Sequence, residues 1–269
     1  MTTATTHDWH ADLALVTEAA RRAGETALSY FRQSPDVWFK NEGRSPVSAA
    51  DLAANKVIED MLRAARPDYG WLSEETDDTS DRLQRQTVFV VDPIDGTRAF
   101  IAGENTWCVS IAVVDRGRPV AAALYAPALG EEFQAVVGGT PLKNGEPVSV
   151  SIPEGDRTLR VATPQGLLNS VEAGFRTTLE RVSHIPSLAY RLTMVADGTI
   201  DATLVQQNSH DWDLAGADLV LECAGGRLCT LDGRPLIYNR AEVRHGTLCA
   251  AGESVLPGLL ASLAGLPEG

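Results

Sequence analysis

The sequence predicts a mixed α+β / α/β fold, and three observations predict it. Two amphipathic helices open the chain, closely spaced strands with hairpin turns follow, and strands alternate with helices after about residue 150. Closely spaced strands favour an antiparallel sheet, whereas strands that alternate with helices favour an α/β layer. We therefore expect an N-terminal α+β domain at 1–150 with an antiparallel sheet, and a C-terminal α/β domain at 151–269.

The composition limits the classes of partner. The chain has 269 residues, of which 44% are hydrophobic, so it can bury a sizeable core. Its 23 Lys and Arg against 36 Asp and Glu give a formal net charge of -13. This charge argues against a nucleic-acid polymer as partner, because no basic stripe exists to replace the counterions. An acidic protein can still bind a small phosphorylated molecule if metal ions invert the local field.

The sequence contains no targeting or membrane signal. The segment Met1–Asp12 has no apolar core of the kind a signal peptide requires, and no stretch approaches the length of a membrane span. The four cysteines form no C-x-x-C pair and have no histidine at zinc spacing, which indicates free thiols in a reducing compartment. We expect a soluble, cytoplasmic protein.

Two helices are expected at the N-terminus. The predicted elements there are, in order, a frayed tail at 1–8, a helix from Trp9 to Phe31, a loop from Asn41 to Pro46, and a helix after Ser48 that ends before Pro67. Ser48 has the chemistry of an N-cap, and Leu52 is counted among the apolar positions of the helix that follows. Asp51 lies in the first turn of that helix, where a negative charge suits the helix dipole.

A run of strands is expected next. They are predicted at Tyr69–Leu72, Thr87–Val91, Val109–Asp115, Val120–Tyr125 and Phe133–Val137. Turn chemistry at Arg116-Gly117 and Asn144-Gly145 indicates hairpins. Pro93 has a fixed φ and no amide hydrogen, so we expect the strand before it to end there.

After residue 150 the pattern alternates. Strands are predicted at Leu159–Ala162, Thr199–Val205, Arg227–Thr230 and Thr247–Ala251. Helices are predicted at about Leu167–Arg181, Leu188–Ala196, Leu214–Cys223 and Ser254–Leu263, with Ser254 as the cap of the last one.

One stretch joins a buried strand to two closely spaced carboxylates. The apolar run that ends at Val91 is followed by the segment Asp92-Pro93-Ile94-Asp95-Gly96-Thr97. Carboxylates at i and i+3 on such a corner point into one small volume, where they repel each other unless a cation lies between them. The amides of Gly96 and Thr97 offer a cradle for an anion such as phosphate. The stretch favours a divalent cation beside a phosphate, and the alternative is an acidic turn with a capping aspartate.

Two further acidic corners follow predicted strands. Glu74-Glu75 follows the strand at 69–72, and Asp213 follows the polar segment that ends the strand at 199–205. Taken singly, the first can be a solvated loop and the second a helix N-cap. Because each of the three acidic corners lies at the mouth of a predicted strand, their combination favours one shared site.

Together these motifs resemble the inositol monophosphatase superfamily. The resemblance spans the chain from Lys40 to the last strand, and its motifs are Leu72-Ser73-Glu74-Glu75, Asp92-Pro93-Ile94-Asp95-Gly96-Thr97, and Trp212-Asp213-x-Ala215 with Ala224-Gly225-Gly226. It implies a layered α/β/α/β/α sandwich of the inositol-monophosphatase (sugar phosphatase) type. It also implies a magnesium-dependent, lithium-inhibited phosphomonoesterase that acts on a small phosphorylated substrate. Homodimers are frequent in this family.

The resemblance also implies a ligand set for two or three Mg²⁺ ions. Glu74, Asp92 and the carbonyl of Ile94 would hold one ion, and Asp92, Asp95 and Asp213 would hold a second, with Asp92 bridging. The residue types fit this independently of the family, because Mg²⁺ takes few oxygen ligands from protein and keeps waters. One of these waters would attack the phosphorus in line.

Catalytic and phosphate-binding roles are carried over in the same way. Glu74 and Thr97 would orient or deprotonate the water, with Thr97 linked to Asp51. The amides of Gly96 and Thr97 would bind phosphate oxygens.

The substrate prediction rests on three positions. Arg98 and Arg191 fall where bisphosphate nucleotidases have lysines, and a guanidinium there can hold a second phosphate in a bidentate way. Gln206 falls where inositol monophosphatases carry a glutamate for the inositol hydroxyls, so its amide disfavours inositol. Leu72–Glu75 and Asp232–Leu236 also look more like the bacterial nucleotidase branch. The favoured prediction is a 3′(2′),5′-bisphosphate nucleotidase that converts adenosine 3′,5′-bisphosphate into AMP and phosphate.

Several alternatives stay open at this stage. They are an inositol-1-phosphate phosphatase, a histidinol-phosphate phosphatase (some of these have a sequence close to Asp95–Phe100), a broad sugar-phosphate phosphatase, and a metal-binding regulatory protein without turnover. His184 and His245 have no acidic partner nearby in the sequence. We expect His210 to have a structural or rim role, Trp107 to lie in the core, and Trp212 to border the site.

Overall fold

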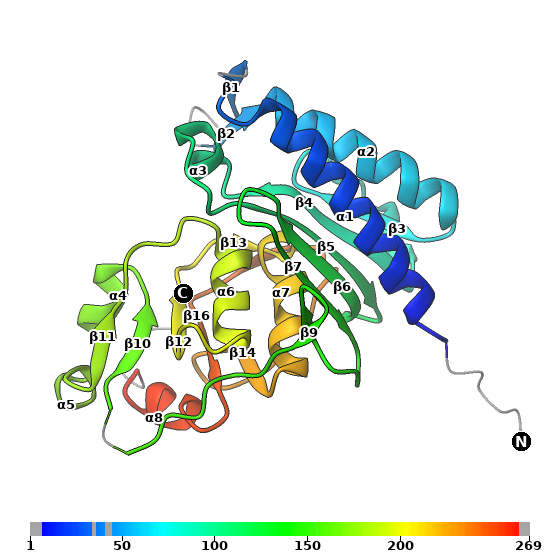
Figure 1. Ribbon diagram of the computed structural model, residues 1–269. Coiled ribbons are helices and arrows are strands. Elements are labelled where there is room, and N and C mark those ends of the chain that lie inside the picture. The colour runs from blue at the N-terminus through cyan, green and yellow to red at the C-terminus, as the bar shows by residue number, and fades with distance from the viewer. Residues whose placement is uncertain (1–6, 34–35, 41–44, 156, 264–269) are drawn as a thin grey trace, which may run out of the picture.

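The architecture is a stack of alternating helical and sheet layers. The computed structural model describes residues 7–33, 36–40, 45–155 and 157–263. In Figure 1, two long helices cover one face of a large sheet, two helices lie between this sheet and a second sheet, and short helices lie beyond the second sheet. The predicted mixed fold and the implied α/β/α/β/α layering are confirmed.

The outer helical layer is formed by α1 (His10–Tyr30) and α2 (Ala49–Ala65). Their buried faces carry many alanines, which lets the two helices and the sheet approach closely. A capping box starts α2: the Ser48 side chain accepts from the amide of Ala50, and the Asp51 side chain accepts from the amide of Ser48. The N-cap prediction at Ser48 is therefore confirmed.

The first sheet has seven strands in sequence order, β3-β4-β5-β6-β7-β8-β9. They are β3 (Gly70–Ser73), β4 (Thr87–Asp95), β5 (Cys108–Asp115), β6 (Arg118–Ala126), β7 (Glu131–Val136), β8 (Leu142–Lys143) and β9 (Glu146–Pro147). Neighbours are antiparallel except β3 and β4, which are parallel. Both predicted tight turns exist, with positive φ at Arg116-Gly117 and at Asn144-Gly145.

The prediction that Pro93 ends its strand is wrong. Strand β4 continues to Asp95, and its pairing with β5 shifts between Asp92 and Asp95. An irregularity of this kind leaves residues without ladder partners, so a proline with no amide hydrogen can be accommodated there. The bulge matters for function because it carries both aspartates of the motif.

The middle layer contains α6 (Leu188–Ala196) and α7 (Asp211–Cys223). Helix α7 is buried along nearly its whole length, because it packs against the first sheet on one side and against β14 (Gly226–Thr230) on the other. Gly216 makes one of these contacts possible: a Cβ there would lie 2.9 Å from Oγ of Ser110.

The second sheet has five strands in the order β11-β10-β12-β16-β14. They are β10 (Leu159–Ala162), β11 (Leu179–Arg181), β12 (Ala202–Val205), β14, and β16 (Leu248–Gly252). The outer side carries the short helices α4 (Gln165–Ser170), α5 (Ala173–Arg176) and α8 (Leu256–Ala261). A separate two-stranded ribbon pairs β13 (Ser209–His210) with β15 (Arg244–His245).

Several local predictions were wrong in ways that have a physical cause. The helix expected at 167–181 is split into α4, α5 and β11, because the Glu172 side chain caps the amides of Gly174 and Phe175 and starts a new helical turn. Val255, not Ser254, is the N-cap of α8. The apolar residue Leu52 is 42% exposed.

The loop expected at 41–46 is partly a hairpin, since β1 (Val37–Lys40) pairs with β2 (Ser45–Ser48). Its positions 41–44, like residues 1–6 of the expected tail, lie outside the described residues. The 3-10 helix η2 (Ser80–Gln84) lies between β3 and β4. The domain boundary near 150 stays a prediction. Among the described residues no helix is long and apolar enough to cross a membrane.

Candidate active site

A cavity of about 450 Å³ opens where the two halves of the chain meet. The short helix α3 (Thr97–Ala102) and strand β2 line one side, and the segment that leads into α6 lines the other. The lining residues are Pro46, Glu74, Asp92, Ile94, Asp95, Gly96, Thr97, Arg98, Ala99, Glu104, His184, Pro186 and Asp213. Five of them carry carboxylates, so this cavity suits a cation, or an anionic ligand that binds together with metal ions.

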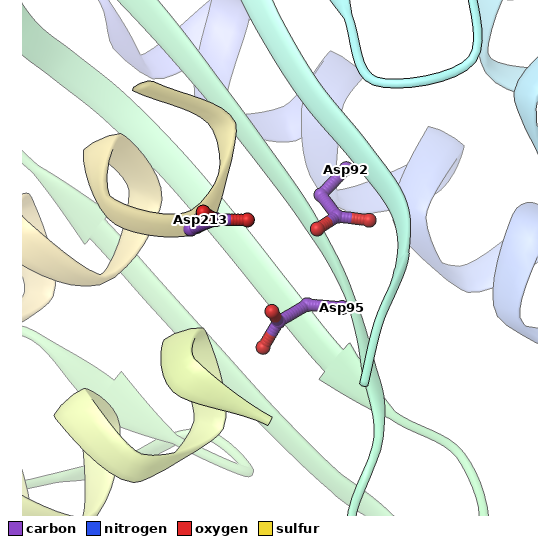
Figure 2. Close-up of side chains that lie close together, drawn as sticks. All are labelled: Asp92, Asp95 and Asp213. Carbon is purple, nitrogen blue, oxygen red and sulfur yellow. The ribbon is translucent and has the colours of Figure 1, made fainter. Parts of the chain in front are cut away.

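Three carboxylates converge at the cavity wall. Asp92, Asp95 and Asp213 each offer one oxygen, and these oxygens all lie within 4.8 Å of one another. Figure 2 shows the three side chains around a shared space between strand β4 and helix α7. The bulge in β4 gives both aspartates of that strand a direction toward α7, which an uninterrupted ladder would not do for residues at i and i+3.

Burial and mutual repulsion make this cluster electrostatically costly without a cation. Burial raises the pKa of Asp92 well above its usual value, and the charges of Glu74, Asp95 and Asp213 raise it further. Burial and the neighbouring Asp213 raise the pKa of Asp95 to about 7. Charged carboxylates that lie this close and this deep need a compensating positive charge.

The carboxylate of Asp95 is held from one side by the start of α6. The Ser187 hydroxyl and the amide of Ala189 both donate to its Oδ2, the latter over 2.7 Å. Within the described part of the chain its Oδ1 receives no hydrogen bond, so this oxygen is available to a ligand. Uncharged donors thus orient Asp95 without cancelling its charge.

Asp213 and Asp51 are positioned by the same local device. Each is the third residue of its helix and closes a capping box, with Oδ2 accepting the backbone amide of the N-cap residue. These bonds are 2.7 Å from His210 to Asp213 and 2.8 Å from Ser48 to Asp51. In both cases the capping bond uses one oxygen and leaves the other to face the site.

Thr97 connects Asp51 to the acidic motif. Its hydroxyl lies 3.0 Å from Oδ1 of Asp51 and 3.0 Å from the carbonyl oxygen of Ile94, so its single proton can be donated to either. The contact between Thr97 and Asp51 expected from the sequence is present. Burial raises the pKa of Asp51, while its hydrogen bonds to Ser48 and Thr97 act in the opposite direction.

Glu74 reaches the cavity from the neighbouring strand. Strand β3 runs parallel to β4 and pairs Ser73 with Val91, so the carboxyl ends of both strands lie at the same edge. Glu74 follows directly, its amide donates to the carbonyl of Val91 over 3.2 Å, and its half-buried side chain lines the cavity. Glu74 and Asp92 line the same cavity, and the charge of Glu74 adds to the burial that raises the pKa of Asp92.

The donor set suits a hard divalent cation. All candidate ligands are oxygens, and no arginine or lysine of the described ranges forms an ion pair with Asp92, Asp95 or Asp213. Mg²⁺ prefers few carboxylates with retained waters, and a polar cavity of this size has room for them. The residues present therefore fit a magnesium site.

Two predicted substrate residues lie apart from the cavity wall. Gln206 is exposed and does not line the cavity. Arg191 is only 7% exposed; its Nη1 donates to the carbonyl of Ile185 over 3.4 Å, and its buried Nε has no hydrogen-bond partner among the residues that the structure describes. Arg98, in contrast, is exposed and lines the cavity. The roles of all three stay predictions.

Sequence reasoning missed two lining residues and one pair. His184 and Glu104 line the cavity, although no motif includes them. The only local signal was the position of His184 shortly before a helix that starts with a serine cap. His245 has an acidic partner after all: its Nε2 lies 2.8 Å from Oδ1 of Asp211, and both side chains are buried.

Of the two tryptophans, Trp107 lies where it was expected, whereas the expectation that Trp212 borders the site is wrong for the cavity wall. Trp107 is fully buried in the core. The half-buried Trp212 stacks on the ring of His210, with 4.6 Å between ring centroids. Trp212 does not line the cavity itself; His210 lies between it and the ribbon residue Arg244, whose Nε is 3.4 Å from Nε2 of His210.

Comparison with known proteins places this site in a family. The model of the inositol monophosphatase family matches residues 8–265. The chain is similar to a 3′(2′),5′-bisphosphate nucleotidase CysQ of Aggregatibacter actinomycetemcomitans, at 29% identity over 84% of this chain and 87% of that protein. It is also similar to a histidinol-phosphatase of Chlorobaculum parvum, at 32% identity over 90% and 96% of the two chains. Among solved structures, the extragenic suppressor protein suhB of Bartonella henselae superposes with a TM-score of 0.82 at 28% identity, covering 95% of this chain and 99% of that one.

Proposed function

The chain belongs to the inositol monophosphatase family and is a phosphoric monoester hydrolase, and from this premise we propose that it is a Mg²⁺-dependent, lithium-sensitive 3′(2′),5′-bisphosphate nucleotidase. The observation that carries the metal dependence is the convergence of Asp92, Asp95 and Asp213 within 4.8 Å, with no arginine or lysine of the described residues paired to any of them. The predicted regulatory alternative without turnover is disfavoured, because the family and the named relatives are phosphatases.

The proposed ligand assignment follows the sequence prediction. Glu74, Asp92 and the carbonyl of Ile94 hold one Mg²⁺, and Asp92, Asp95 and Asp213 hold the other. When bound, the metal supplies a Lewis acid for the phosphate and lowers the pKa of a water. The protein's own part is to hold these oxygens in place through Ser187, Ala189 and the capping boxes.

Thr97 and Asp51 provide a route for the proton of the attacking water. The Thr97 hydroxyl can accept a hydrogen bond from the water while it donates its own proton to Oδ1 of Asp51. Asp51 is buried and keeps two further donors from Ser48 on its other oxygen, so its orientation is fixed. We assign Glu74 to orient the water, because its carboxylate lies at the cavity wall next to Asp92.

The bisphosphate substrate is favoured by two observations. Arg98 lies in the cavity wall, where a guanidinium can contact a second phosphate, and one named relative is a bisphosphate nucleotidase. The main alternative is histidinol phosphate, since another relative of similar identity is a histidinol-phosphatase. Inositol 1-phosphate is the third candidate.

The test is phosphate release with Mg²⁺, with and without lithium, from adenosine 3′,5′-bisphosphate, histidinol phosphate and inositol 1-phosphate. We expect the highest kcat/KM on the bisphosphate and inhibition by lithium. Arg98→Gln should raise KM for the bisphosphate about tenfold, which is the loss of one charge-assisted contact, and leave inositol 1-phosphate hydrolysis nearly unchanged.

A higher kcat/KM on either monophosphate would contradict the substrate proposal while leaving the metal assignment intact. Equal loss on all three substrates in Arg98→Gln would instead place this arginine on the transferred phosphate. Release that continues in metal-free buffer would contradict the assignment of the carboxylates.

A further inference from the structure

A second cavity of about 390 Å³ lies on the C-terminal half, outside the site described above. Its lining residues are Thr230, Leu231, Arg234, Pro235, Leu236, Ile237, Arg240, Arg244, His245, Gly246, Thr247 and Leu248. Three arginines and a histidine are among them, and no aspartate or glutamate is. In a protein with a net charge of -13, a hollow without any acidic side chain is unexpected for a merely solvated surface.

The guanidinium groups of two of these arginines contact only neutral acceptors, although the backbone amide of Arg244 donates to the carboxylate of Glu242. Nε of Arg240 donates to the carbonyl of Ile237 over 3.0 Å, and Nε of Arg244 faces the imidazole of His210 over 3.4 Å. Neither forms an ion pair with a carboxylate of the described residues, whereas Arg157 in the same half is paired with Asp201. The charges of Arg240 and Arg244 are thus left uncompensated beside each other, which costs free energy.

The segment that carries these arginines is fixed before any ligand arrives. Buried Arg82 donates from Nη1 to the carbonyl of Arg240 over 2.9 Å and to Oδ1 of Asn239 over 2.8 Å. The amide of Asn239 in turn donates to Oδ2 of Asp211, whose other oxygen binds His245. A rigid backbone under two flexible cationic side chains lowers the entropic cost of binding an anion.

We propose that this cavity is a second anion site, which binds a phosphate group through Arg240 and Arg244. Arg234 lines the same cavity and also pairs with Asp232, so it adds positive potential at the rim. Guanidinium groups match phosphate oxygens in geometry and bind them in a bidentate way. Leu231, Leu236 and the 59% exposed Ile237 give the same cavity apolar walls. The ligand chemistry that fits is a small organic phosphate with an apolar or planar body.

The phosphate can come from two sources. Arg244 contacts His210, and Nδ1 of His210 lies 3.7 Å from Oδ2 of Asp213, so the side chain of His210 links a lining residue of the second cavity to a lining residue of the first. The occupant is therefore either the distal phosphate of a substrate that reaches past His210, or a separate organic phosphate. Both share the chemistry that Arg240 and Arg244 recognise.

The first experiment is calorimetric titration of metal-free protein with inorganic phosphate and with AMP. Without metal the first cavity presents clustered carboxylates and repels anions, so the titration reports on the second cavity whether or not the proposed substrate is correct. We expect wild type to bind and the double variant Arg240→Gln/Arg244→Gln to bind at least about tenfold more weakly. Arg227→Gln, which removes an exposed arginine paired with Glu253, and Arg98→Gln in the first cavity should bind like wild type.

The second experiment identifies the source of the phosphate. A rise in KM of the double variant for adenosine 3′,5′-bisphosphate, with KM for inositol 1-phosphate unchanged, supports the distal phosphate of the substrate. Weakened AMP binding with both KM values unchanged supports a separate ligand. Wild type that binds neither phosphate nor AMP and shows the same KM values as the double variant overturns the proposal. Binding that is lost in Arg98→Gln but kept in the double variant also overturns it.

Discussion

The two cavities of this protein are lined by charges of opposite sign, although His210 contacts a lining residue of each, Asp213 of the first and Arg244 of the second. The first is lined by five carboxylates and the second by three arginines and no carboxylate. In each cavity, the charged groups that we propose as the main ligands are held largely by uncharged partners. Backbone amides and a serine hydroxyl orient Asp95 and Asp213, and carbonyls and an imidazole hold Arg240 and Arg244.

A paired charge elsewhere in the chain shows what this difference means. Asp201 accepts hydrogen bonds from Ser151, Arg157 and the amide of Arg160, and these contacts hold its pKa at about 2. That carboxylate is compensated within the fold and needs no ligand. Where only neutral groups hold a charged side chain in place, its charge stays uncompensated and can bind a ligand of opposite sign. The following variants test this difference between compensated and uncompensated charges.

Asp92→Asn is expected to have the largest effect. Loss of the carboxylate shared by both proposed metal positions removes several kcal/mol of transition-state stabilisation, so kcat/KM should fall about 10³-fold or more. The metal-free variant should nevertheless unfold at a higher temperature than metal-free wild type, because a buried charge that repels its neighbours is gone. Phosphate release and thermal denaturation, each with and without Mg²⁺, measure both effects. A lower metal-free melting temperature would show that Asp92 is compensated after all.

Thr97→Val should have the second largest effect on catalysis. It removes the hydroxyl between Asp51 and the motif while conserving the shape of the side chain, and we expect kcat to fall about 10²-fold, the lower range for a proton-transfer group. The Mg²⁺ concentration for half-maximal activity should stay near the wild-type value, because no carboxylate is lost. Thr97→Ser keeps the hydroxyl and is the matched control. Equal losses in the valine and serine variants would contradict the proton route and indicate a packing role.

Ser187→Ala should weaken metal binding rather than turnover. The serine hydroxyl donates to Asp95, and removal of such an outer partner costs about 10- to 100-fold in metal affinity. The same variant loses the N-cap of α6 and about 1 kcal/mol of stability, so the metal titration is compared at a temperature where both proteins are folded. Ser187→Thr keeps the hydroxyl and should restore the affinity. An unchanged Mg²⁺ requirement would leave Ser187 with only the capping role.

The sequence predicted the acidic cavity well and the basic cavity not at all. Glu74 directly follows β3, Asp213 lies in the first turn of α7, and Asp92 and Asp95 lie at the end of the apolar strand β4, so local patterns were enough to predict all four. Arg240 and Arg244 lie on an irregular segment whose path is set by distant partners, chiefly Arg82 and Asp211. No periodicity describes such a segment, and for the same reason the partnership of His245 with Asp211 was missed.

The helices and strands show the same difference between features set by local residues and features set by distant partners. Strands with hairpin turns and helices with a strong cap were predicted nearly to the residue, as for α2 and for β5 with β6. The bulge at Pro93 was missed because proline alone predicts the end of a strand, whereas the continued pairing depends on β5. The helix at 167–181 was wrong because one side chain, Glu172, restarts the backbone in its middle. Caps and turns can be predicted from neighbouring residues, whereas pairing with a distant strand cannot.

Asp218→Asn is expected to have the smallest effect, on stability alone, and it tests a buried carboxylate that lines neither cavity. Burial raises the pKa of Asp218 to about 6, although Tyr238 donates to its Oδ2 over 2.8 Å. The folded state therefore binds more protons than the unfolded state between about pH 4 and pH 6, and Asp218 makes wild type less stable as the pH rises through this range, by at most about 3 kcal/mol. The asparagine keeps an acceptor for Tyr238 and removes this pH dependence. Urea denaturation of both metal-free proteins at pH 4.5, 5.5 and 6.5 should show a stability difference that grows in favour of the variant as pH rises, with phosphate release unchanged. A stability difference that does not change with pH would mean that Asp218 is already ionised in the folded protein and compensated by Arg118. Asp218 would then resemble Asp201, whose charge needs no ligand.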